Sequence, residues 1–156
     1  MNAVMESRIR AIVQSAETEH DLRKAFAGAA QFEIGIVRGR LDDQRVDRLG
    51  PQDVLILDLD LADRRDMAAL ERVLATDARP TVVVTSATAS MDAMRQLIRL
   101  GVADFLPQPI VREDVMGVIQ AVRSRLRASP DRPVHECKVL SFVHRSGGMG
   151  ATSLAI

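Results

Sequence analysis

The sequence feature that most constrains the fold is an alternation of two patterns. Five times, a short run typical of a buried strand is followed by a longer segment whose apolar residues repeat at helical spacing. Strands that alternate with helices pair in parallel, and right-handed crossovers place the helices on both faces of the sheet. The sequence therefore predicts an α/β fold with a doubly wound, five-stranded parallel sheet. The strand runs are 9–13, 32–37, 53–59, 81–86 and 103–106.

The helical segments differ in how clearly the sequence marks them. Thr18 and Asp21 stand at the spacing of a capping box, which predicts that the first helix begins there. The segment 41–49 has only Val46 and Leu49 as a weak apolar face, and we expect a short second helix there. The other helices have regular apolar stripes and are expected at about 67–74, 90–100 and 112–127.

Charge and composition exclude several classes of function. Lysine plus arginine total 21 and aspartate plus glutamate total 21, so no net charge attracts nucleic acid or anionic lipid. No apolar run reaches the length of a membrane span, and the N-terminus is no secretory signal. The single cysteine, Cys137, excludes an internal disulfide framework, and the histidines show no metal-ligand spacing. We therefore expect a cytoplasmic protein without a metal site.

Polar side chains gather where the predicted strands end. Asp58 and Asp60 end the third strand and Thr85 and Ser86 end the fourth, at the edge where open α/β sheets bind ligands. The stretches DVLILDLDL, PTVVVTSA and GVADFLPQPI resemble, in this order, three strands of the receiver domain of response regulators. The resemblance spans residues 8–127 and implies the flavodoxin-like arrangement of the receiver fold.

The receiver resemblance implies roles for three residues. Asp58 stands at the phosphoacceptor position, Thr85 at the position of the switch hydroxyl, and Gln108 at the position of the receiver's lysine. The acidic pair that holds Mg²⁺ in receivers is replaced by Gln14 and Ser15, which supply no anionic ligand. We therefore expect an atypical receiver without catalysis and without a bound metal, in which Asp58 is not phosphorylated.

The residues leave a second hypothesis open. In a working receiver, Asp58 would accept a phosphoryl group while Glu17 or Asp60 assisted the metal. The bond between Gln108 and Pro109 is in either case a candidate cis peptide, as in the receiver family.

A second pattern begins after residue 128. The segment 129–136 contains two prolines and is expected to be a linker. A strand-like run, KVLSFV, then leads into GGMGATS, which resembles the deviant Walker A motif of ParA and MinD ATPases. Residues 137–156 are therefore expected to be the first strand and P-loop of a truncated ATPase domain. The resemblance implies nucleotide binding by Gly147, Gly148, Gly150 and Thr152, whereas Ser146 and Ala151 replace the lysines of the motif.

An atypical receiver joined by a proline linker to a P-loop without its lysine resembles the TadZ/CpaE family of pilus assembly proteins. The resemblance implies a non-catalytic interaction and localisation module of an ATPase-like protein of Flp (tight-adherence) pili. Its expected partners are pilus assembly proteins and a second copy of the chain, which would place it at a pole or at the inner face of the membrane. We expect no nucleic acid partner. ATP and Mg²⁺ are expected only for a full-length chain, and an ATPase active in that form is the third hypothesis.

Overall fold

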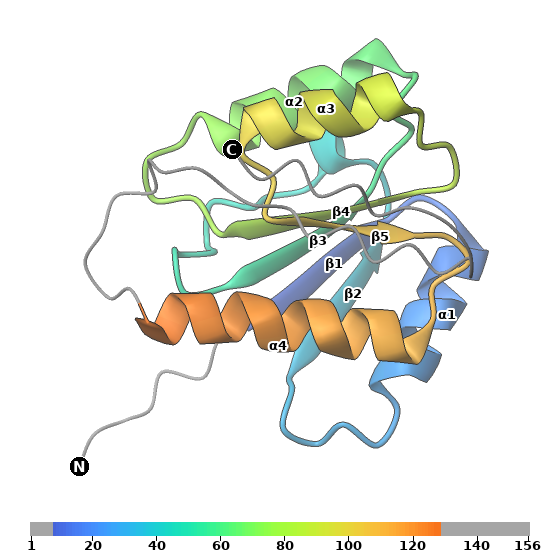
Figure 1. Cartoon of the computed structure of the whole chain (residues 1–156), viewed down its shortest axis with the longest axis vertical. Helices are drawn as coiled ribbons and strands as arrows, with labels where there is room; N and C mark the ends of the chain where they lie inside the picture. Colours follow the sequence, from blue (N-terminus) through green and yellow to red (C-terminus); the bar gives the residue numbers. More distant parts are fainter. Residues whose placement is uncertain (1–7, 129–156) are drawn as a thin grey trace, which may run out of the picture.

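The structure, a computed structural model, describes residues 8–128 (Figure 1). The predicted linker and the predicted ATPase start lie outside the described residues. The strands are β1 (Ile9–Val13), β2 (Ile34–Arg38), β3 (Val54–Asp58), β4 (Thr81–Ser86) and β5 (Asp104–Pro107). The helices are α1 (Ala16–Phe26), α2 (Arg64–Leu74), α3 (Met91–Leu100) and α4 (Arg112–Ala128), with one 3₁₀ turn, η1 (Leu41–Asp43).

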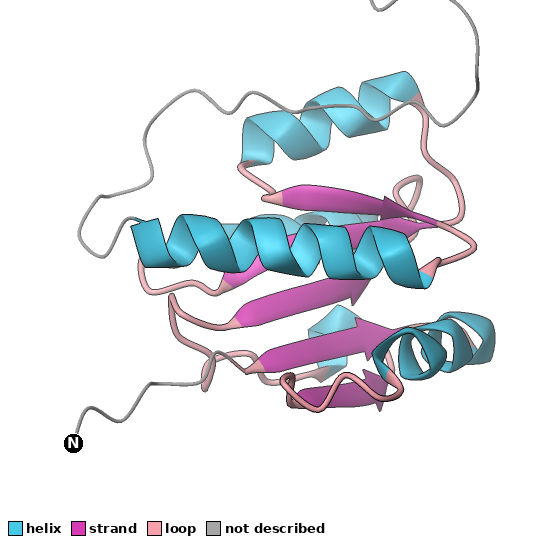
Figure 2. Cartoon of the chain, turned by 60° about the horizontal axis from the view of Figure 1, so that its bottom comes forward, coloured by secondary structure: helices cyan, strands magenta, loops and turns pink. Residues whose placement is uncertain are grey.

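The strands form one parallel sheet in the order β2-β1-β3-β4-β5. The chain winds outward from β1 in both directions, with α1 and α4 on one face and α2 and α3 on the other (Figures 1 and 2). This is the doubly wound, flavodoxin-like arrangement that the sequence predicts. Each helix runs back from the carboxyl edge of the sheet, so the loops at that edge lie together.

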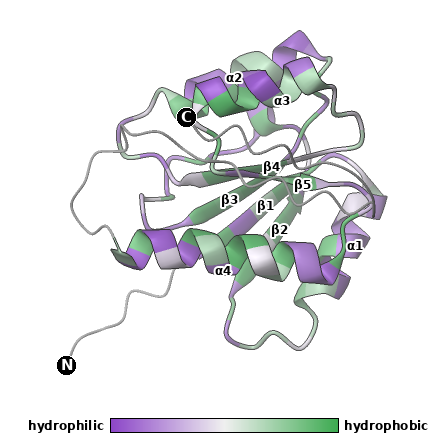
Figure 3. Ribbon diagram, viewed as in Figure 1, coloured by the Kyte–Doolittle hydropathy of each residue, from purple (hydrophilic) through white to green (hydrophobic). Residues whose placement is uncertain are grey.

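Strand β3 lies between two apolar layers. All five of its residues are buried, since Val54 and Ile56 face α1 and α4 while Leu55 and Leu57 face α2 and α3. Figure 3 shows the sheet largely in the hydrophobic colour and the helices in both colours, as amphipathic helices over a core require. The rigid centre of the sheet fixes the position of Asp58, the last residue of β3.

The predicted second helix over 41–49 is wrong. Only the single turn η1 forms, and the chain then runs as an irregular segment to β3. Leu41 and Leu49 are buried against the face that α2 and α3 cover, so the segment still shields the sheet. Two apolar contacts separated by polar residues cannot stabilise a helix of this length, because helix nucleation is costly.

The predicted start of the first helix is also wrong. Helix α1 begins at Ala16, and Ser15 is its N-cap: the Ser15 hydroxyl accepts a hydrogen bond of 3.0 Å from the Thr18 amide. Serine in an extended conformation is a favoured N-cap, and Thr18 is buried inside the first turn. The difference matters for function, because Ser15 follows β1 directly and lies at the carboxyl edge.

Candidate functional site

The candidate site lies at the carboxyl edge of the sheet and centres on Asp58. This residue ends β3, is 8% exposed, and is the register partner of Thr85 on β4. Gln14 and Ser15 follow β1, and Gln108 follows β5. The doubly wound topology thus gathers at one edge side chains that are far apart in the sequence.

Both oxygens of the Asp58 carboxylate accept hydrogen bonds. Oδ1 accepts from the Gln108 side-chain amide at 2.9 Å, and Oδ2 accepts from the backbone amides of Gln14 at 3.0 Å and Ser15 at 3.4 Å. The structure therefore brings Asp58 and Gln108 into contact. All three donors are neutral groups, so within residues 8–128 the carboxylate has no cation as a partner. The expected cis peptide between Gln108 and Pro109 is present.

The hydroxyl of Thr85 is the unusual polar group of the site. Thr85 is fully buried, and its Oγ1 has no hydrogen-bond partner in the part of the chain that the structure describes. Its neighbour Ser86 is also buried, but the Ser86 hydroxyl bonds the backbone of Thr88 at the start of the next loop. A buried hydroxyl without a partner is costly, and such groups concentrate at functional sites. Thr85 therefore stays a candidate site residue.

A second buried carboxylate, Asp66 on α2, organises the loops beside Asp58. Asp66 is 2% exposed and accepts hydrogen bonds from the Gln14 side-chain amide at 2.6 Å and from the Asp60 backbone amide at 2.9 Å. Its other oxygen accepts from the Arg40 guanidinium at 2.6 Å. The Gln14 side chain is therefore held on Asp66, whereas its backbone amide donates to Asp58.

Arg40 joins this cluster to the N-terminus of α2. Its guanidinium also donates to Asp63, the N-cap of α2, at 2.7 Å. The hydrogen bond to Asp63 raises the pKa of Arg40, and the same bond lowers the pKa of the Asp63 carboxyl. One cation thus ties the segment after β2 to the start of α2.

Sequence reasoning missed Arg40 and Asp66. Asp63 carries a local signal, because an aspartate just before a helical segment is a favoured N-cap. The contact of Arg40 with Asp66 joins residues 26 positions apart. No local pattern reveals it, and only the order of the strands brings the two together.

The residues at this edge do not fit a divalent metal. Mg²⁺ prefers several anionic oxygen ligands, and only Asp58 supplies a carboxylate at the centre of the site. Asp60 is exposed and its Oδ1 accepts from the Ala62 amide, and Glu17 is also exposed. Among residues 8–128 no group of three or more His, Cys, Asp or Glu side chains is arranged to hold a metal.

The nucleotide-binding residues implied by the P-loop resemblance lie outside the described residues. These are Gly147, Gly148, Gly150 and Thr152.

Within residues 8–128, no helix combines the length and the hydropathy needed to cross a bilayer.

The fold is shared with solved structures of two kinds. The pilus assembly protein CpaE from Caulobacter crescentus superposes with a TM-score of 0.65 and 21% identity over 75% of this chain and 93% of that chain. A response regulator from Thermotoga maritima superposes with a TM-score of 0.63 and 15% identity over 76% of this chain and 98% of that chain. At these identities the likeness shows the receiver fold, which confirms the predicted fold class.

One curated relative is similar in sequence. A protein-glutamate methylesterase/protein-glutamine glutaminase from Rhodospirillum rubrum is 24% identical over 134 residues. The match covers 79% of this chain but only 36% of the relative, so the chain spans about a third of that protein. No protein-family model matches the chain.

Proposed function

We propose that the chain is a receiver-like interaction module of a pilus assembly protein and that it does not carry out phosphoryl transfer. The main evidence against phosphoryl transfer is the set of hydrogen-bond partners of Asp58. Its oxygens accept from Gln108 and from two backbone amides, and the Gln14 side chain is held on Asp66. Phosphoryl transfer to an aspartate needs a metal and a cation to neutralise the phosphoryl oxygens, and the described residues around Asp58 supply ligands for neither.

The assignment to pilus assembly is supported by two independent likenesses. Three solved chains of CpaE pilus assembly proteins share the fold over most of the residues in each solved chain. The sequence after residue 128 resembles a proline linker and a P-loop without its lysine, a combination typical of the same family. The module then acts through contacts with other proteins, and these contacts position a larger ATPase-like protein where the pilus is assembled.

Intact-mass spectrometry tests the chemical part. We expect no gain of one phosphoryl mass when the chain is incubated with acetyl phosphate and Mg²⁺. The matched control is the triple variant Gln14→Asp, Ser15→Asp, Gln108→Lys, which restores the residue types of a working receiver. A phosphoryl adduct on the wild-type chain that disappears in Asp58→Asn would overturn the proposal.

A second candidate function, a phosphorylatable receiver, is favoured by one observation. The unpartnered hydroxyl of Thr85 stands beside Asp58 in the sheet register, where a bound oxyanion would give it a partner. The same mass measurement decides between the two, because Thr85→Val would lower phosphorylation in a working receiver and leave an interaction module unmodified.

Cellular tests address the pilus part. In the source organism, deleting the codons for residues 8–128 is expected to abolish pili. Asp58→Asn is expected to leave the number of pili unchanged. Loss of pili in Asp58→Asn at normal protein levels would contradict a module that works by contacts alone.

For a chain that extends beyond residue 156, we further propose that the glycine-rich loop binds ATP with Mg²⁺. Backbone amides in such loops converge on phosphates even without a lysine. Titration of the full-length protein with a fluorescent ATP analogue is expected to show saturable binding. Gly148→Val is expected to reduce it, and unchanged binding in that variant would count against a phosphate loop.

A further inference from the structure

Strand β2 lies at one edge of the sheet, and its outer side has no neighbouring strand among residues 8–128. The Ile9 amide of β1 donates to the Glu33 carbonyl just before β2, and in a parallel ladder this pattern repeats at every second residue. The odd-numbered residues of β2 therefore bond β1. The even-numbered residues point their backbone amides and carbonyls away from the sheet, and these are Ile34, Ile36 and Arg38.

The opposite edge of the sheet is protected against pairing, whereas β2 is not. Strand β5 has only four residues and ends in Pro107, which has no amide hydrogen. The Asp104 side chain also accepts from the Phe105 amide at 2.9 Å. Strand β2 contains no proline, and its one charged residue, Arg38, is the last. Short strands, prolines and charges are the usual means of blocking an edge, so β2 is the edge that can accept a strand.

One face of β2 is open as well. The segment 41–49, which was expected to form a helix, forms only the turn η1. Gly35 is exposed, and a Cβ atom at this position would meet no other atom within 4 Å. Val37, two positions further along the strand, is half-buried. A strand beside β2 therefore has room for large side chains next to Gly35.

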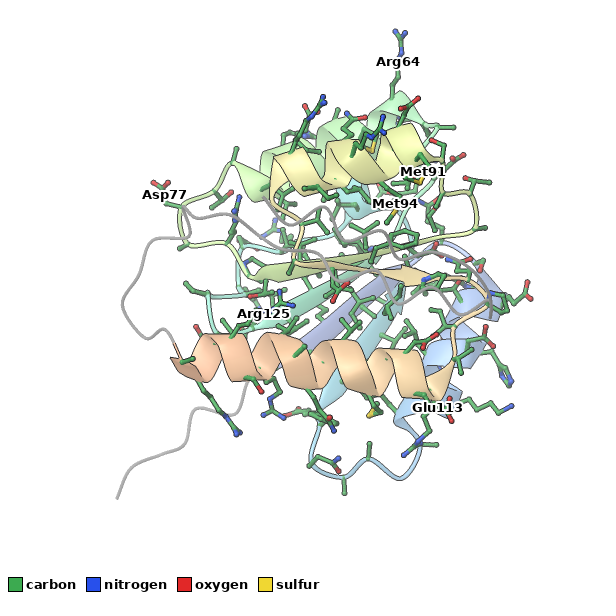
Figure 4. All side chains as sticks on the ribbon, viewed as in Figure 1. Arg64, Asp77, Met91, Met94, Glu113 and Arg125 are labelled. Atoms are coloured by element: carbon green, nitrogen blue, oxygen red, sulfur yellow. The ribbon has the colours of Figure 1, made fainter. Side chains whose placement is uncertain are left out.

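Helix α4 ends close to this edge. Figure 4 shows Glu113 at the start of α4 and Arg125 near its end, on the side of the molecule where Asp77 precedes β4. The guanidinium of Arg123 lies over the ring of Phe32 at 4.9 Å, and Phe32 precedes β2 by two residues. The helix ends five residues after Arg123, about 7.5 Å further along its axis. The chain therefore leaves α4 near the amino end of β2.

The handedness of the fold leads toward the same edge. Helices α1 and α4 lie on one face of the sheet, and the crossover through α1 leads from β1 to β2, away from β5. A right-handed crossover through α4 leads in the same direction, because parallel connections share one hand. The other strands occupy every position on that side of β5, so the first free position is the outer edge of β2.

We propose that residues 138–143 of the same chain, KVLSFV, bind to the outer edge of β2 as a sixth parallel strand. The nine residues 129–137 connect this run to α4, and when extended they span about 30 Å. Leu140 and Phe142 are two positions apart, so they share one face of a strand and cover Gly35 and Val37. The new strand also gives hydrogen-bond partners to the outward backbone groups of β2.

The tether favours this occupant over a partner peptide or a second copy. A segment on a short flexible linker has an effective concentration on the order of millimolar, which a separate molecule rarely reaches. The inference goes beyond the proposed function, because it assigns an intramolecular partner to the receiver-like sheet. In a longer chain the strands of an ATPase domain would compete for the same segment, so the pairing is proposed for the chain of 156 residues.

Site-resolved hydrogen exchange of the 156-residue chain tests the pairing. The amides of Ile36 and Arg38 are expected to be protected, because they donate to the added strand. In Phe142→Lys this protection is expected to fall about tenfold or more, because the ammonium group opposes burial on the contact face. The matched control is Leu154→Lys, which changes an apolar residue outside the docking segment and is expected to have no effect.

A second variant blocks the edge from the side of β2. Gly35→Lys places a charged side chain in the open space beside the strand and is expected to cause the same loss of protection. Its control is Gly117→Lys on α4, where an exposed glycine is also surrounded by open space. Unchanged exchange of the amides of β3 verifies that both variants fold.

Three results would overturn the inference. They are rapid exchange of the Ile36 and Arg38 amides in the wild type, protection that survives Phe142→Lys, and protection that rises with protein concentration. The last result would identify a second copy as the occupant. None of these results bears on the phosphodonor experiment, so the two proposals fail separately.

Discussion

Strand β3 has a buried carboxylate at each end, and the two are held in different ways. Asp53, just before the strand, is 1% exposed and accepts from the backbone amides of Gly50 and Arg8 and from the Arg8 guanidinium. Asp58, at the end of the strand, accepts from two backbone amides and from the neutral side chain of Gln108. Each carboxylate joins β3 to one end of β1. Of the two, only Asp53 has a cation among its partners in the described range 8–128.

The difference separates a carboxylate that has a cation among its partners from one whose partners among residues 8–128 are all neutral. Burial by itself raises the pKa of Asp53, but hydrogen bonds from Gly50 and Arg8 more than offset it, and the pKa lies below its ordinary value of 3.8. The ionised form of Asp53 is therefore part of the fold. At Asp58 the side-chain partner is an amide, which can rotate to offer either its nitrogen or its oxygen. We therefore expect the carboxyl edge to tolerate a loss of charge at Asp58 better than the opposite edge tolerates it at Asp53.

The largest expected effect is that of Asp53→Asn. The backbone amides of Arg8 and Gly50 donate to different oxygens of Asp53, so the single oxygen of the introduced asparagine leaves one part-buried amide without its partner. We therefore expect a loss of about 2 kcal/mol in the free energy of unfolding. The ion pair itself contributes little of this, because the Arg8 side chain is 55% exposed. Urea unfolding measures the loss, with the exposed Asp77→Asn as the control. A loss of less than about 1 kcal/mol in the free energy of unfolding would show that Asp53 is no more important for stability than we expect Asp58 to be.

The pH dependence of stability sharpens the same contrast. A carboxyl with a lower pKa in the folded state stabilises the fold above its unfolded pKa, and this stabilisation is lost as the pH falls through the folded pKa. The advantage of the wild type over Asp53→Asn is therefore expected to be complete at neutral pH and to shrink below pH 3.8. Urea midpoints measured between pH 7 and pH 2.5 test this. A constant difference across that range would show that the charge of Asp53 is not what matters.

Asp58→Asn is expected to have a smaller effect, below about 1 kcal/mol. The introduced oxygen can still accept from the Gln14 and Ser15 amides, and the Gln108 side chain can rotate so that its oxygen accepts from the introduced amide. Urea unfolding under the conditions used for Asp53→Asn measures the difference. Equal losses at both ends would mean that Asp58 is as much a structural anion as Asp53.

The fold is predictable from sequence because its signals are local. Strand β1 has the predicted bounds, and β3 is apolar on both faces because it is covered on both. Gly101 ends α3 with a positive φ of 86°, as a glycine after the last apolar position of a helix predicts. The segment 41–49 was predicted wrongly because its weak apolar face indicates burial but not conformation. Tertiary contacts of Leu41 and Leu49 decide its path.

Sequence analysis predicts only those site residues that stand at motif positions of the receiver family. Asp58, Thr85 and Gln108 stand where strands end, and the structure brings Asp58 and Gln108 into hydrogen-bond contact. The resemblance says nothing of Arg40 or Asp66, because these have no counterpart among the motif positions. Their contact depends on the path of the chain after β2, where the helix prediction failed. Where a segment departs from the expected pattern, its side chains take on contacts that no motif records.

The smallest expected effect comes from giving Asp58 the cation that Asp53 has. Gln108→Lys places an ammonium group beside a carboxylate at a partly exposed position, so we expect a change in unfolding free energy of no more than about 0.5 kcal/mol. The informative quantity is the coupling free energy between Gln108→Lys and Asp58→Asn, which a double-mutant cycle of unfolding free energies measures. In the lysine background the rotating amide is gone, so removing the charge of Asp58 is expected to cost about 0.5 kcal/mol more than in the wild type. Repeating the cycle in 1 M salt is expected to reduce this coupling, because a screened ion pair is its source. A coupling free energy of zero at low salt would show that the neutral side chain of Gln108 is not the reason why Asp58 and Asp53 differ in their contributions to stability.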